Sequence, residues 1–214
     1  MERLTPQIVF TFSLLGFLPV IGIFALAGNK AGEILTDPHK YFELVRNPSP
    51  MDFFWMIAGN LGDAVGYYLI ILPIAVALLR QAQSPLGRAS AWLIGLYGVN
   101  GAFWAIVSAV ALPIAASRSA SDWQTVTTIC QNIGWGIIGN LLGSLGWLAM
   151  GMSLFSRYRW FAVFSIVLGL LYFCSGQIAK SFMPKWLGTV GIGFYLVFQL
   201  IVWNPWAAWI VAMP

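Results

Sequence analysis

Apolar residues fill six long runs of this chain, and the short stretches between the runs hold most of the charged residues. A transmembrane helix needs about 20 predominantly apolar residues, and each run reaches that length. The pattern predicts an all-α, polytopic integral membrane protein, in which one transmembrane domain over residues 1–214 is a bundle of six helices with short loops. The predicted spans are about 7–28, 52–79, 89–115, 132–155, 159–179 and 186–211.

The composition supports a membrane protein over a soluble one. Hydrophobic residues make up 59% of the chain and charged residues 8%, whereas a soluble domain carries about 25% charged residues. A soluble protein would need a polar shell that these few charges cannot form. The net charge of +4 comes from Lys and Arg residues that stand singly or in pairs. No basic stripe is present, so the pattern does not indicate nucleic-acid binding.

The first run has a second interpretation. Arg3 precedes it and Ala25-Leu26-Ala27 closes it, which is compatible with a cleaved signal peptide. The run is long for a signal peptide, and we therefore expect a retained span.

Two short connections, 80–88 and 156–158, carry only basic charges. Short loops report orientation best, because basic residues stay on the cytoplasmic side. We therefore expect a multi-pass protein of a cell membrane with both termini in the cytoplasm, although the total number of basic residues on the two sides is close to equal. The basic residues expected on the cytoplasmic side are Arg3, Arg80, Arg88, Arg157 and Arg159.

A short amphipathic helix is expected between the first two spans. Asp37 suits an N-cap with Pro38 at the first helical position. Phe42 and Val45 would lie on an apolar side and Glu43 on a polar side. Such a helix is typical of a segment on the membrane surface.

The second and fourth spans resemble each other at an offset of 80 residues. Gly59-Asn60-Leu61 matches Gly139-Asn140-Leu141, and Trp55 matches Trp135. Internal repeats are common in transporters, while chance similarity between apolar helices is the alternative. The glycines in both segments have the small-xxx-small spacing that lets helix backbones approach closely.

Asp63 is the one acidic residue in the middle of a predicted span. A carboxylate in hydrocarbon is costly and usually faces a bundle interior or a cavity. No Lys or Arg lies in the middle of a span to neutralise it. We expect Asp63 to be protonated, or else charged beside water, hydrogen-bond donors or a ligand.

Other polar residues occur at depths compatible with that of Asp63, on the second, third and fourth spans. One interpretation is a site that binds a small molecule or passes a proton. A structural hydrogen-bond network that fixes helix registry is the second, and an Asp63 near the interface that reaches water is the third. The candidate ligand-binding residues are Asp63, Asn60, Tyr67, Asn100, Asn140 and Ser144.

Catalytic and metal-binding patterns are missing from the sequence. His39 is the only histidine and falls in the connection between the first two spans, so neither a serine–histidine–acid set nor a haem or metal ligand set is evident. HExxH, GxSxG and Walker patterns are also missing. Cys130 and Cys174 form no CxxC, and we expect two free thiols before a disulfide.

Two segments carry a resemblance to a known family. "GNLGDAVGYYLIILPIAVALLR" in the second span and "GWLAMGMSLFSRYRWFAVFSIVLGLLYFCSG" across the fourth and fifth resemble a family of six-span bacterial membrane proteins known only as a domain of unknown function. The resemblance covers the helical layout more than the residues, and the Trp-rich last span departs from it. It implies a bacterial inner membrane and implies no activity.

The sequence therefore favours a membrane protein that binds or transports an apolar or amphiphilic small molecule at a polar site between helices. A non-catalytic accessory subunit of a larger membrane complex is the alternative, and an intramembrane enzyme comes third. Membrane lipid, a hydrophobic small molecule and partner transmembrane subunits are the expected partners, and the cofactor is unknown.

Overall fold

The computed structural model describes residues 38–176 and a few single positions outside that range, which are 7, 8, 11, 15, 178, 179, 182, 184, 186 and 187. Every secondary-structure element in the range 38–176 is a helix, which confirms the all-helical class. The predicted spans 7–28 and 186–211 lie almost entirely outside the described residues. The count of six spans therefore stays a prediction.

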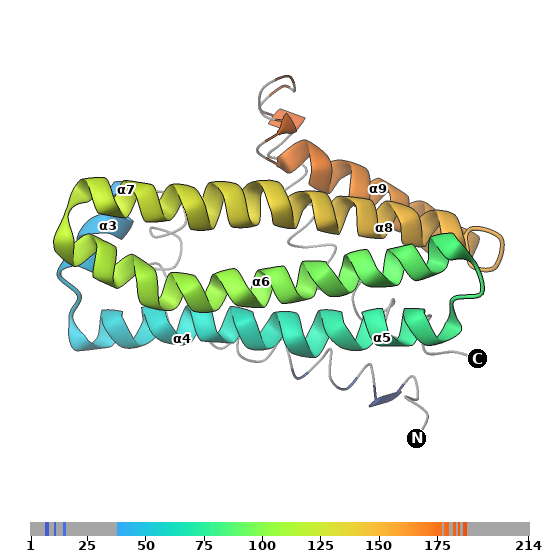
Figure 1. Cartoon of the computed structure of the whole chain (residues 1–214), viewed down its shortest axis with the longest axis horizontal. Coiled ribbons are helices and arrows are strands. Elements are labelled where there is room, and N and C mark those ends of the chain that lie inside the picture. The colour runs from blue at the N-terminus through green and yellow to red at the C-terminus, as the bar shows by residue number, and fades with distance from the viewer. Residues whose placement is uncertain are drawn as a thin grey trace.

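The helices follow one another with few breaks. Three long rods, α4–α5, α6 and α7–α8, lie side by side, and α9 leans on α8 (Figure 1). The elements are α3 (Pro38–Arg46), α4 (Pro50–Gly66), the π-helix η1 (Tyr67–Ile71), α5 (Leu72–Gln81), α6 (Pro85–Arg118), α7 (Ala120–Thr127), the π-helix η2 (Thr128–Gly139), α8 (Asn140–Leu154) and α9 (Arg159–Ser175).

Three helical segments of the described chain are long and apolar enough to cross a membrane. They are Asn60–Arg80, Pro85–Arg118 and Ala120–Leu154, and α9 is a shorter apolar helix. At about 1.5 Å per residue, the 34-residue α6 is about 51 Å long. The hydrocarbon core of a bilayer is about 30 Å thick, so α6 extends past it into the headgroup region.

The helical segment that contains the predicted fourth span is longer than the span. We expected the span to begin at residue 132, and the continuous helical segment begins at Ala120, with only Ser119 between it and α6. Ser119 has an extended backbone, and its hydroxyl accepts a hydrogen bond from the Asp122 N–H at 3.0 Å, which caps α7. The polar residues of α7 lower its mean hydropathy. A hydropathy pattern detects the apolar part of a helix and not its polar ends, so it did not detect α7.

The expected helix between the first two spans is present as α3. Its Val45 is only 3% exposed and packs with Leu112 and Ala116 of α6. The Phe42 ring lies 5.5 Å from the Trp123 ring of α7. The apolar side of α3 therefore contacts the end of the bundle. Asp37, the expected cap, lies outside the described residues.

The core of the bundle is built where α5, α6, α8 and α9 meet. Tyr97 and Trp147 have no exposed surface, and Ile74, Ile94, Phe161 and Leu168 are buried around them. Large apolar side chains also cover the outside, including Trp92, Phe103 and Met152. A chain with apolar residues on both its inner and outer faces suits lipid as the surrounding solvent.

Candidate functional site

Two π-helical segments contact the middle of α6. They are η1, on the rod formed by α4 and α5, and η2, on the rod formed by α7 and α8. A π-helix makes i→i+5 hydrogen bonds, is usually a single turn, and is frequent at functional sites. The 12 residues of η2 make it unusually long for a π-helix, which singles out this part of the bundle as a candidate site.

On the η1 side, Tyr67 fills the space that a glycine leaves open. A Cβ atom placed on Gly101 of α6 would lie only 2.5 Å from the Tyr67 ring. The same ring has its centroid 5.2 Å from the Trp135 ring of η2, and its hydroxyl oxygen lies 3.3 Å from that of Tyr97. Tyr67 thus joins three long segments at one point.

On the η2 side, Asn100 of α6 makes two hydrogen bonds. Its Nδ2 donates to the Gly134 carbonyl oxygen at 3.1 Å, and its Oδ1 accepts from Trp104 Nε1 at 3.0 Å. The Trp104 ring lies on Gly134, where an added Cβ would overlap the ring. Asn100 therefore ties α6 to the backbone of the π-helix.

The next polar group joins α8 to the end of α9. Asn140 Nδ2 donates to the Tyr172 carbonyl oxygen, which also accepts from Ser175 Oγ at 2.6 Å. One turn later along α8, Ser144 is 1% exposed, and its buried Oγ has no hydrogen-bond partner within the described part of the chain.

Several of the expected site residues lie near one another in the structure, but the hydrogen bonds of Asn100 and Asn140 go to other residues and not to each other. A Cβ on Gly139, the neighbour of Asn140, would lie 3.0 Å from Asn100 Nδ2, so the two asparagines are at similar depths. They nevertheless bond to different helices. Asn60 is half-buried in α4. The backbone of Asp63 lies in α4 one turn before Tyr67, and its side chain is outside the described residues.

Sequence reasoning missed an aromatic cluster beside these residues. Tyr97 and Trp147 stack edge-on with centroids 5.4 Å apart, and Tyr172 lies 5.0 Å from Trp147. In the sequence, Gly143 is the residue that could have indicated this cluster, because a Cβ there would meet the rings of Tyr97 and Tyr172. The aromatic cluster consists of Tyr67, Tyr97, Trp135, Trp147 and Tyr172.

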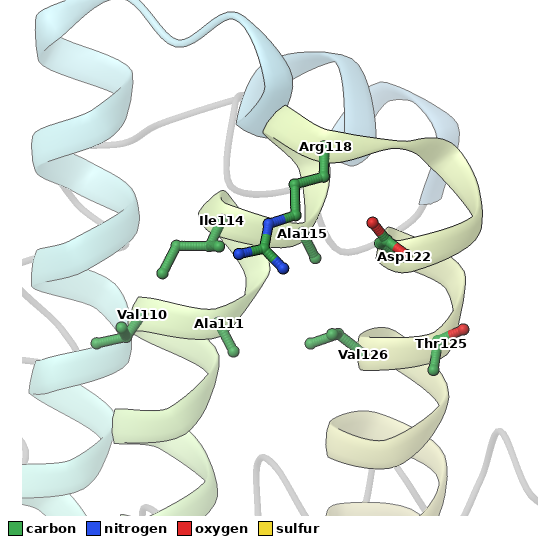
Figure 2. A pocket seen from close by; sticks show the side chains of 8 residues that line it. All are labelled: Val110, Ala111, Ile114, Ala115, Arg118, Asp122, Thr125 and Val126. Atoms are coloured by element: carbon green, nitrogen blue, oxygen red, sulfur yellow. The ribbon is translucent and has the colours of Figure 1, made fainter.

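A groove of about 370 Å³ lies at the end of the bundle where α6 meets α7. Figure 2 shows Arg118 extending over the groove from α6 and Asp122 on the opposite wall, from α7. Thr125 lies below Asp122 on the same wall. The apolar lining is Val110, Ala111, Ile114, Ala115 and Val126.

Neither place offers a set of metal ligands. Within residues 38–176 and the other described positions, no three His, Cys, Asp or Glu side chains gather closely enough to hold a metal ion. Cys130 is buried, and both it and Cys174 are free thiols.

Comparisons with protein-family models, with curated proteins and with solved structures found no match to this chain.

Proposed function

We propose that this protein binds or transports an apolar or amphiphilic small molecule at a site between α4, α6 and η2. One observation carries the proposal. Both π-helical segments meet α6 at the turn from Asn100 to Trp104, where polar and aromatic side chains converge.

The π-helical backbone gives this depth a chemistry that a plain α-helical bundle lacks. Within a bilayer, backbone groups that leave the regular helix pattern must find partners inside the protein. The Asn100 amide supplies one such partner to Gly134. A ligand with its own donor or acceptor can take the place of either group, while the rings of Tyr67 and Trp104 contact its apolar body.

Asp63 completes the proposed site. It precedes Tyr67 by four residues in the same helical rod, which is about 6 Å along a helix. We assign to Asp63 the role of the one ionisable group at the site, as acceptor for a ligand or as a carrier of a proton. Asn60, Asn140 and Ser144 are the further polar groups of the proposal.

The proposed setting is a bacterial inner membrane crossed six times, with both termini in the cytoplasm. The turn between α5 and α6 and the turn between α8 and α9 lie at the same end of the bundle (Figure 1). Basic residues at that end support its cytoplasmic placement. They are Arg80, Arg88, Arg157 and Arg159.

The test is the identity of what copurifies with the protein. The full chain is purified in a mild detergent, extracted with organic solvent, and the extract analysed by mass spectrometry. We expect a small molecule in the wild-type extract that is reduced at least tenfold in Asn100→Leu. The matched control is Thr128→Ala, an exposed change in η2, which should retain the molecule.

Asp63→Asn separates transport from simple binding. A proton-coupled carrier loses transport with this change and stays folded. An accessory subunit, the alternative, shows little effect of Asp63→Asn and migrates with large partners on a native gel. Equal extracts from the wild type and Asn100→Leu would contradict the proposed site.

A further inference from the structure

The groove between α6 and α7 is a second place where the described chain offers a ligand both apolar and charged contacts. It lies at the bundle end formed by Ser119, far along α6 from Asn100. Its volume of about 370 Å³ falls at the lower part of the range of small-molecule sites, about 300–1,000 Å³.

The groove is deep enough for the upper part of one lipid acyl chain. Arg118 is the last residue of α6, and α6 is long enough to reach the headgroup region. From Arg118 back to Val110 the helix descends about 12 Å toward the hydrocarbon. The charged mouth therefore lies at headgroup depth, and Ile114 and Val126 line the groove below it.

The two charges at the mouth are of opposite sign and lie on opposite walls. Both side chains are exposed, and neither forms an ion pair with another described residue. The Arg118 guanidinium is a good donor for phosphate oxygens, while the Asp122 carboxylate repels a second negative charge and accepts hydrogen bonds from an ammonium group.

We propose that this groove binds a phospholipid whose zwitterionic headgroup carries a primary ammonium, as in phosphatidylethanolamine. The phosphate contacts Arg118, the ammonium donates to Asp122, and one acyl chain lies along Ala111 and Ile114. A quaternary ammonium has no N–H to donate to Asp122. A headgroup with only negative charge leaves Asp122 beside a like charge.

The test is native mass spectrometry of the full-length protein released from nanodiscs of three compositions: phosphatidylethanolamine, phosphatidylcholine and phosphatidylglycerol. The wild type should retain one phosphatidylethanolamine per chain and retain the other two lipids at least fivefold less. Arg118→Gln should lower that retention about tenfold. Arg88→Gln removes an exposed arginine near the other end of the same helix and should leave it unchanged.

Two further variants test the rest of the geometry. Asp122→Asn should abolish the preference for phosphatidylethanolamine over phosphatidylcholine. Ala111→Phe fills the groove and should reduce retention of all three lipids. Equal retention of the three lipids by the wild type, or equal retention of phosphatidylethanolamine by Arg118→Gln and Arg88→Gln, would overturn the proposal. Neither result bears on the site at Asn100, whose ligand is measured separately.

Discussion

Glycines on α6 and η2 are the positions where aromatic side chains enter the bundle. The ring of Tyr67 occupies the space over Gly101, and the ring of Trp104 occupies the space over Gly134. These contacts lock two bulky side chains against a neighbouring backbone. The glycine spacing predicted close packing at other glycines of the second and fourth spans, and it did not predict that a ring would lie on Gly101 or Gly134.

Gly101→Ala should destabilise the protein, because the added methyl group overlaps the Tyr67 ring. Overpacking of this kind costs about 1–3 kcal/mol. The control is Gly95→Ala in the same helix, where the new Cβ would meet only Ala75 at 3.5 Å and helix propensity improves. Thermal unfolding in detergent should show a lower midpoint for Gly101→Ala and an equal or higher midpoint for Gly95→Ala. Equal midpoints for the two variants would contradict the packing described for Tyr67.

Ser144→Ala should leave the stability unchanged or raise it. A buried hydroxyl without a partner costs about 1–3 kcal/mol by mutational measures, and alanine removes that cost. Ser90 is the matched control, because it is also fully buried and its Oγ donates to the Gly87 carbonyl oxygen at 2.8 Å. We expect Ser90→Ala to lower the unfolding midpoint relative to Ser144→Ala. The reverse order would show that the Ser144 hydroxyl is bonded in the folded protein.

At the scale of elements, a single residue divides the two longest helical segments. Ser119 caps α7, and its own N–H bonds to the Ala115 carbonyl oxygen at the end of α6. The spans predicted from hydropathy, 89–115 and 132–155, lie almost entirely within the helical segments Pro85–Arg118 and Ala120–Leu154. Hydropathy missed the helical residues 120–131, because several of their side chains are polar and the apolar run begins after them. The π-helical backbone of η2 left no signal in the apolar pattern.

Ser119→Ala should weaken the joint between α6 and α7. Loss of an N-cap hydroxyl costs about 1 kcal/mol, which for a chain of this size corresponds to about 2–4 °C in the unfolding midpoint. Ser121→Ala is the control, since Ser121 is exposed and contributes only its carbonyl oxygen, to the Thr125 hydroxyl. An unchanged midpoint for Ser119→Ala would contradict a stabilising role for the Ser119 cap.

At the scale of the whole molecule, the two ends of the bundle differ in charge. The end with the α5–α6 and α8–α9 turns carries arginines, whereas the opposite end carries Glu43, Asp52 and Asp122 beside Lys40, Arg46 and Arg118. The linear sequence counted basic residues on each side as nearly equal. In the fold, all the described acidic residues except Asp63 lie at one end of the bundle.

The arginines at the end with the α5–α6 and α8–α9 turns predict that this end is cytoplasmic and that the opposite end is reached from outside the cell. In a background where both cysteines are replaced by alanine, single cysteines are introduced at Gln83 and at Ser121, both of which are exposed. A membrane-impermeant maleimide added to intact cells should label Ser121→Cys and spare Gln83→Cys, and permeabilised cells should show both labelled. The opposite pattern would reverse the proposed orientation.

The sequence by itself determined that the protein is helical and apolar enough to cross a membrane, because the length of an apolar run and its scarcity of charge are local properties of the chain. It also singled out Asn100 and Asn140 as polar groups within predicted spans. The partners of those groups, the aromatic cluster, the π-helical turns and the groove at Arg118 were decided only by the tertiary structure. A hydrogen bond from Asn100 to Gly134 joins residues that are distant in sequence, and only the packing of one helix on another brings them within reach.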